Sequence, residues 1–235
     1  MKNINSMCTI RAYSRHSLIL LLCMFAYPLF AQTDIACLAP GAESQLAALL
    51  NKPALVQSAA AEPLGKNWFR MELDAHVFTD QANLEQVRSV LLDMENHDRI
   101  FDGKKNKRRA SVVSRTAGET IVDFVSVTVA PLGIQIKTNY RASMRTTINT
   151  ESGFACEIRQ TPQDSDSNRD IKNLVAIRYA QEVIINGDTY TYIRIYSIDD
   201  VNAGILPNAK KTFENNSGPA NEEALELIIA AARTR

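Results

Sequence analysis

Alternating hydrophobic and polar residues begin at Trp68 and predict a strand that buries one face. Single polar residues separate the hydrophobic ones of this segment, which are Phe69, Met71, Leu73, Ala75 and Val77. From Leu84 to Met94 the hydrophobic spacing becomes that of one helical stripe, and Asp80 or Asn83 can cap this helix. A short second helix is expected over residues 97–101.

Beyond Gly103 the pattern predicts β structure as far as residue 199. Six strands are expected, at residues 109–116, 119–130, 133–148, 153–161, 174–185 and 189–199. The turns between them are short, as at Asn186-Gly187, and short turns favour an antiparallel meander because parallel strands need long crossovers. The last 30 residues predict a C-terminal helix, which the segment Asn215-Asn216-Ser217-Gly218-Pro219 is expected to interrupt.

These elements predict an α+β fold with a curved, seven-stranded antiparallel sheet, whose apolar face is covered by the C-terminal helix. Two short helices follow the first strand. Upstream, a short helix is expected at residues 41–50 and a loose, Pro- and Ala-containing lead-in at residues 51–65. The predicted organisation is therefore residues 1–31 as a leader, 32–66 as an N-terminal helix and lead-in, and 67–235 as one folded domain.

The leader has the order of a secretory signal peptide. Lys2, Arg11 and Arg15 precede an apolar run over residues 18–30, and the small residue Ala31 follows. This run has 13 residues, whereas a spanning helix needs roughly 20, so a membrane anchor is the alternative interpretation. The sequence thus predicts an exported bacterial protein, periplasmic or secreted, whose mature chain begins near Gln32.

Removing the leader changes the charge and the cysteine count. The whole chain has 26 basic and 26 acidic residues, and the leader holds three of the bases, so the remainder has a net charge of −3. General binding to nucleic acid is therefore not expected. Cys37 and Cys156 remain after cleavage; they could form a disulfide in an oxidising compartment, or stay as two thiols with Cys156 in the core.

Three stretches carry a resemblance to a known superfamily: LEQVRSVLLD at residues 84–93, the hairpin NGDTYTYIRIY at 186–196, and DDVNAGILP at 199–207. Over residues 68–235 the chain resembles the helix-grip fold of the START-like superfamily. That superfamily includes START lipid-transfer domains, polyketide cyclases/dehydrases and the birch-pollen-allergen family. The interrupted C-terminal helix departs from the pattern, because relatives have a longer continuous one.

The resemblance implies a cavity between the sheet and the C-terminal helix that holds a lipid or another apolar small molecule. Its expected walls are Ile134, Ile136, Tyr140, Met144, Leu225, Ile228 and Ile229. The alternative is that these residues form a filled core.

Polar residues on the last two strands are further candidates for the ligand site. Tyr192 and Arg194 share one face of the last strand, and Arg178 is expected to face the same way. An arginine inside the cavity could hold a carboxylate or a phosphate through paired hydrogen bonds. The alternative is a solvated outer face, because the opposite positions of the last strand are more apolar.

A run of basic residues lies between the second helix and the next strand: Lys104, Lys105, Lys107, Arg108 and Arg109. Such a patch could make transient contact with an anionic membrane surface. The alternative is a solvated loop.

No catalytic set, metal site or cofactor motif is predicted, because the sequence contains no Gly-x-Ser-x-Gly elbow, no Gly-rich phosphate loop and no His-Glu-x-x-His. The favoured hypothesis is an exported protein that binds, or also transports, a lipid or other apolar small molecule. The alternatives are a cyclase- or hydrolase-like enzyme on the same fold, and a protein-interaction module without a ligand.

Overall fold

The computed structural model describes residues 50–58, 62–129, 135–161, 171–185, 187–202 and 209–235. The predicted signal peptide at residues 1–31, Cys37, and all but the last residue of the helix expected at 41–50 lie outside these ranges.

Within the described residues, nine strands form one sheet in the order β1-β3-β9-β8-β7-β6-β5-β4, and β2 also pairs with β3. All of these pairings are antiparallel. The strands are β1 (Ala54–Ser58), β2 (Glu62–Gly65), β3 (Trp68–Thr79), β4 (Asn106–Arg115), β5 (Thr120–Val129), β6 (Gln135–Asn149), β7 (Gly153–Gln160), β8 (Ile171–Ile185) and β9 (Asp188–Asn202). The predicted α+β class and antiparallel sheet are confirmed.

The strand count differs from the predicted seven because residues 51–65 are not the expected loose lead-in. They contain β1 and β2, which both pair with β3. Without them, one edge of β3 would present a row of unpaired backbone N–H and C=O groups. The prolines that suggested a loop are tolerated, because an edge strand does not need every N–H for pairing.

Two short helices follow β3, as predicted: α3 (Leu84–Leu92) and α4 (His97–Ile100). Asn83, rather than Asp80, caps α3. Its side chain accepts a hydrogen bond from the Gln86 backbone N–H at 2.9 Å, and the Gln86 side chain accepts one from the Asn83 N–H at 2.9 Å. This reciprocal capping box satisfies two backbone donors and fixes the start of the helix.

The C-terminal helix α5 (Ala209–Ala232) is continuous, so the predicted interruption at residues 215–219 is wrong. The polar side chains of this segment bond back to the helix: Ser217 Oγ donates to the Phe213 carbonyl at 2.7 Å, and Asn221 Nδ2 donates to the Ser217 carbonyl at 2.8 Å. Pro219 lacks an N–H for the carbonyl of Asn215. Because Asn215 is exposed, that carbonyl can face water instead.

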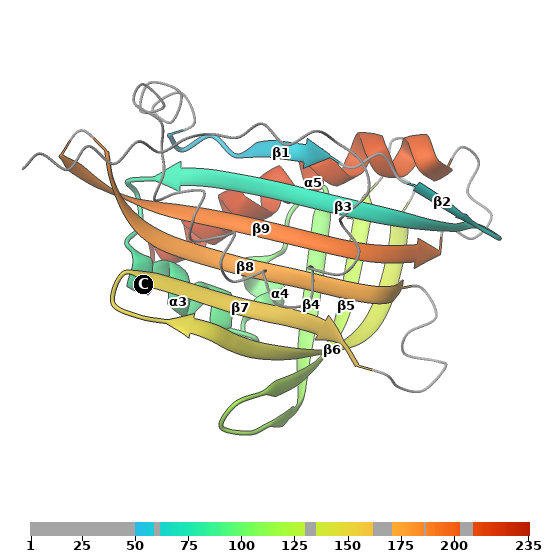
Figure 1. The fold of residues 1–235 in the computed structure, drawn as a ribbon, viewed down its shortest axis with the longest axis horizontal. Coiled ribbons are helices and arrows are strands. Elements are labelled where there is room, and N and C mark those ends of the chain that lie inside the picture. The colour runs from blue at the N-terminus through green and yellow to red at the C-terminus, as the bar shows by residue number, and fades with distance from the viewer. Residues whose placement is uncertain (1–49, 59–61, 130–134, 162–170, 186, 203–208) are drawn as a thin grey trace, which may run out of the picture. The chain divides into compact units, whose positions relative to one another are not determined.

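The sheet is strongly twisted: β4 and β5 cross the direction of β3, β9 and β8, and β6 bends so that its end runs alongside β7 (Figure 1). Helix α5 packs against β3, β4, β5 and β9, so the sheet curves around one side of the helix. We call the side of the sheet that faces α5 the inner face and the other side the outer face. Among the described helices, none has the length and apolar character to cross a membrane.

Two hydrophobic clusters lie on the inner face. The larger one joins the C-terminal half of α5 to α3 and to most strands, and it includes Leu225 and Ile228. The smaller one, here called the apolar cluster, consists of Met71, Ile171, Leu174, Val201 and Phe213. The core is therefore continuously packed beneath the C-terminal half of α5. Beneath the N-terminal half of α5, the apolar cluster is separate from the larger cluster.

Candidate functional site

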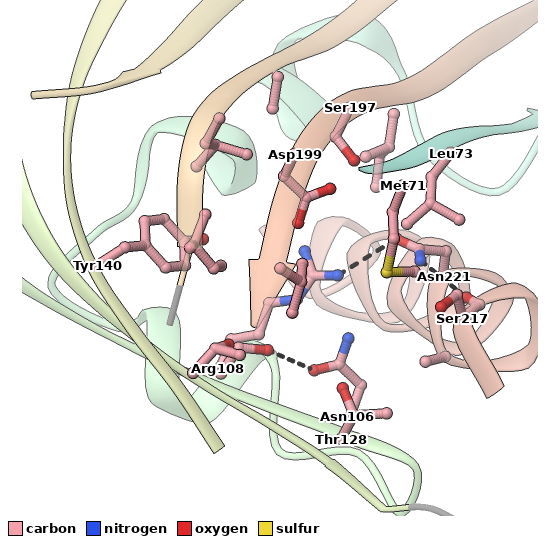
Figure 2. Close-up of a pocket in the computed structure, with 18 of the residues that line it drawn as sticks. Met71, Leu73, Asn106, Arg108, Thr128, Tyr140, Ser197, Asp199, Ser217 and Asn221 are labelled. Atoms are coloured by element: carbon pink, nitrogen blue, oxygen red, sulfur yellow. Dashed lines mark hydrogen bonds between the residues drawn. The ribbon is translucent and has the colours of Figure 1, made fainter. Parts of the chain in front are cut away.

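A cavity of about 150 Å³ lies between the inner face of the sheet and the N-terminal half of α5 (Figure 2). Every strand from β3 to β9 contributes to its wall, and α5 contributes Phe213, Asn216, Ser217, Ala220 and Asn221. The cavity lies here because most of the side chains that this half of α5 points toward the sheet are polar or small, and they do not fill the space as the apolar side chains of the other half do. Polar and apolar residues both line the space.

The apolar cluster lies toward one end of this wall. On β9, Ile195 and Val201 both line the cavity, and at roughly 3.3 Å per residue they are about 20 Å apart along the strand. Val201 is paired with Ile171 of the apolar cluster, whereas Ile195 is paired with Arg178. The strand register thus separates an apolar end from an end that carries a positive charge.

Arg178 is 5% exposed and lines the cavity from β8. Its Nη1 donates to the carbonyl of Leu91 at 3.3 Å, and its Nη2 lies 3.4 Å from Nε2 of His97. Burial lowers the pKa of this guanidinium, and repulsion from Arg108 lowers it further. Even so, an arginine in a protein stays protonated, so Arg178 is a buried positive charge.

Arg108 points into the same cavity from β4 (Figure 2). Its Nη2 donates to Oδ1 of Asn221 on α5 at 3.3 Å. The guanidinium carbons of Arg108 and Arg178 lie 5.6 Å and 5.9 Å from the ring centre of Phe101. Two guanidinium groups therefore gather around one aromatic ring, and burial lowers the pKa of Arg108 as it does that of Arg178.

Neither guanidinium has a carboxylate oxygen within 4.0 Å among the described residues. The carboxyl group that lines the cavity with them belongs to Asp199 of β9. Burial raises the pKa of Asp199 to about 7, Asp200 raises it further, and Arg108 opposes the rise. Near neutral pH the described residues of the cavity wall therefore contribute two positive charges and one partly protonated carboxyl group.

His97 adds no charge to this region. It is fully buried, and burial together with the neighbouring Arg178 and Arg108 lowers its pKa to about 2. A neutral imidazole can accept the hydrogen bond from Arg178 at Nε2 when its proton is on Nδ1. Nδ1 is buried without a hydrogen-bond partner among the described residues.

A clamp between α5 and the start of β4 positions Arg108. The Glu223 carboxylate accepts hydrogen bonds from the backbone N–H groups of Lys104, Lys105 and Asn106 at 2.8, 2.8 and 2.9 Å. Gly103 makes this approach feasible, because a Cβ there would lie 2.4 Å from a Glu223 oxygen. The clamp thus fixes the β4 backbone two residues before Arg108 and opposite Asn221.

The structure divides the predicted wall residues between two places. Tyr140 lines the cavity and stacks on Phe124 with ring centres 5.2 Å apart, and Arg178 also lines it. Four others lie in the solid core instead: Met144, Leu225, Ile228 and Ile229. Ile134 and the side chain of Ile136 lie outside the described residues. The inner face thus has a cavity beneath the N-terminal half of α5 and a filled core beneath the C-terminal half.

Tyr192 and Arg194 lie on the outer face, so they do not share a face with Arg178 as expected. Register is the reason, because Arg194 is paired with Tyr179 and Arg178 with Ile195. Arg194 forms a two-pronged ion pair with Asp74 at 2.8 and 2.7 Å. The Tyr192 ring lies 4.9 Å from that of Phe78. These residues belong to a polar and aromatic network on the outer face.

The run of basic residues is also divided. Lys104, Lys105, Lys107 and Arg109 are exposed, whereas Arg108 points inward. Lys107 pairs with Asp102 at 2.7 Å.

Cys156 is a buried free thiol, 1% exposed, and its predicted disulfide partner Cys37 lies outside the described residues. Burial raises the pKa of this thiol to about 11.

Sequence reasoning missed Arg108, Asp199 and Asn221 as members of one site. A signal for Arg108 was present, because Ala110 and Val112 continue its side of the strand with small and apolar residues. That alternation places Arg108 on the buried face and Arg109 on the exposed one. Because the residues around Arg108 are mostly basic, the sequence suggested that Arg108 belongs to the same exposed run.

No model of a protein family matches the sequence, and no curated protein matches it. Among solved structures, a STAR-related lipid transfer protein from Xanthomonas axonopodis is 10% identical, with a TM-score of 0.49, and the match covers 77% of this chain and 99% of that one. A Thermus thermophilus protein is 15% identical, with a TM-score of 0.43, and the match covers 69% of this chain and 94% of that one.

By the order and pairing of its own elements, this chain has the helix-grip arrangement that its resemblance to the START-like superfamily led us to expect: a curved antiparallel sheet, two short helices after an early strand, and a C-terminal helix against the inner face.

Proposed function

We propose that this protein binds a lipid or another apolar small molecule in the cavity beneath the N-terminal half of α5. The observation that supports this most is the hollow itself, which lies beside the apolar cluster where a filled core would otherwise be expected. Moving apolar surface of a ligand from water into this space would contribute about 25 cal/mol for each Å² buried.

The size of the cavity limits what it can hold without a change of shape. At about 150 Å³, it compares with an engineered apolar cavity of about 150 Å³ that accommodates benzene. Typical small-molecule sites are roughly 300–1,000 Å³. A long-chain ligand would therefore require the N-terminal half of α5 to move away from the sheet.

Export and transport are further parts of the proposal. The order of basic, apolar and small residues in residues 1–31 supports export to the periplasm or beyond. The exposed bases Lys104, Lys105, Lys107 and Arg109 could make transient contact with anionic lipid headgroups, although Lys107 already pairs with Asp102. In that case the protein would collect or release its ligand at a membrane.

Filling the cavity tests the proposal with a matched pair of variants. Ala176 lines the cavity from β8, whereas the next residue, Ile177, points to the outer face. We expect A176F to abolish binding of an apolar fluorescent probe, because the new ring occupies the space, and I177F to bind as the wild type does. The measurement is a fluorescence titration of all three proteins, with thermal unfolding to confirm that each is folded.

Equal binding by the wild type and A176F would contradict this location for the ligand. If none of the three proteins bound apolar probes or extracted lipids, ligand binding itself would be refuted.

A further inference from the structure

The two arginines of the cavity form an arrangement that binding of an apolar molecule does not explain. Charged side chains are seldom buried without an opposite charge, because desolvating an ion costs far more than desolvating a neutral group. Arg178 is buried and Arg108 is half-buried, and both face the cavity without a carboxylate partner within 4.0 Å among the described residues. The hydrogen-bond partners that they do have are neutral: Asn221, His97 and the Leu91 carbonyl. The Asp199 carboxyl lines the same cavity and attracts Arg108, but only from beyond 4.0 Å.

Contrast with the outer face shows that three arginines there are paired with acids. Arg194 pairs with Asp74, Arg70 with Asp200, and Arg141 with Asp123, each through two hydrogen bonds. Arginine–carboxylate pairing is therefore the rule for these outer-face arginines, and the two cavity arginines depart from it. Their unused N–H groups can bind an anion that comes from outside the chain.

The inner wall also has an apolar part, which determines what else the ligand must contain. Arg178 is level with Ile195, about 20 Å along β9 from Val201 of the apolar cluster. Hydrogen-bonding groups from Asn106, Ser126, Thr138 and Ser197 line the wall as well. A purely apolar molecule would leave the guanidinium groups desolvated, and a small free anion would leave the apolar cluster without a contact.

We propose that the ligand is an amphipathic anion whose carboxylate or phosphate group binds between Arg108 and Arg178, while its apolar part lies against the apolar cluster. This inference rests on the proposed function and narrows its ligand class. Asn221 holds Arg108 in place, and Phe101 supports both guanidinium groups from one side. Lipid acids and phosphate monoesters have this chemistry, whereas sterols, alcohols and hydrocarbons do not.

Probes that share one alkyl chain and differ in the headgroup test the charge directly. Decanoate, decyl phosphate and decanol are titrated by calorimetry, each below its critical micelle concentration, with inorganic phosphate as a fourth probe. We expect at least one of the two anionic probes to bind the wild type about tenfold or more tightly than decanol, since one charge-assisted pair contributes about that factor. Whichever anion binds more tightly identifies the headgroup as carboxylate or phosphate.

Arginine variants then assign the effect to the two side chains. R108M and R178M are each expected to weaken the preferred anionic probe about tenfold or more and to change decanol binding much less. R109M is the matched control, because Arg109 is the next residue on β4 and is exposed, so its probe affinities should equal those of the wild type. We expect the unfolding temperature of ligand-free R108M to change little, since the guanidinium of Arg108 has no carboxylate oxygen within 4.0 Å in the described part of the chain and its hydrogen-bond partner is the neutral Asn221.

Each outcome decides between the two proposals. Equal affinity for decanol and for both anions in the wild type would overturn the anionic-ligand inference and leave apolar binding intact, and that comparison needs no variant to fold. Equal losses for acid and alcohol in R108M and R178M would mean a structural role for the arginines, and would also overturn it. Inorganic phosphate that binds as tightly as decyl phosphate would refute the apolar part. No binding of any probe would refute the proposed function.

Discussion

Replacing Asp199 with asparagine is expected to stabilise the protein at pH 8 and to have little effect at pH 4. The folded state raises the pKa of Asp199 from its ordinary 3.8 to about 7, mainly through burial. Between these two values the folded chain holds a proton that the unfolded chain has released, so the stability of the wild type falls as pH rises from about 4 to about 7. A difference of roughly three pKa units corresponds to about 4 kcal/mol.

Urea unfolding of wild type and D199N at intervals from pH 4 to pH 8 measures this effect. The two free energies of unfolding should agree near pH 4 and diverge in favour of D199N by up to about 4 kcal/mol near pH 8. D200N is the control, because Asp200 is adjacent but lies on the outer face and pairs with Arg70 at 2.9 Å. It should be less stable than the wild type at pH 8. A constant difference between D199N and wild type across the range would contradict the environment assigned to Asp199.

Replacing Leu225 with alanine should destabilise the protein strongly without affecting the ligand. Leu225 is fully buried in the larger hydrophobic cluster, beneath the C-terminal half of α5. Leu→Ala changes at such positions cost about 2–5 kcal/mol, because the removed methyl groups leave a cavity. Leu225 does not line the cavity described here, so the affinity for an apolar probe should stay within about twofold of the wild type.

The control is Leu227→Ala, two residues along the same helix, since Leu227 is only partly buried. We expect it to lose clearly less free energy of unfolding than L225A. A large change in probe affinity for L225A at a temperature where it is fully folded would show that the ligand space extends under the C-terminal half of α5. That result would contradict the division of the core.

Much of the fold could be predicted because local patterns determine it. The period of two in β3, the stripe of α3 and the short turns of the meander each follow from neighbouring residues. The strands β1 and β2 could not be predicted in this way, because the prolines and alanines of residues 51–65 interrupt the alternation, although β2 joins β3 through the short turn at residues 66–67. The continuity of α5 could not be predicted from the sequence either. The polar side chains of Ser217 and Asn221 suggest a loop, and they fit the helix because they donate hydrogen bonds to carbonyls of the preceding turn.

The site was harder to predict than the fold because the decisive information is the register between strands. Alternation shows that Tyr192 and Arg194 share a face, but not which face meets α5. Pairing of Arg178 with Ile195 puts Arg178 and Arg194 on opposite faces, and the cavity beneath α5, which Arg178 and Ile195 line, identifies the face of Arg178 as the inner one. The Asp199–Arg108 combination joins two strands that are far apart in the sequence, so local sequence patterns could not indicate it.

Mass spectrometry of gently purified protein shows whether the cavity holds a ligand. Wild type, A176F and I177F are expressed together with their leader, purified without detergent, and extracted with organic solvent. We expect one amphipathic compound, near one per chain, from the wild type and I177F, and its absence from A176F. The same compound at the same amount from all three proteins, or none from any of them even after incubation with a panel of lipids, would contradict ligand binding in the cavity.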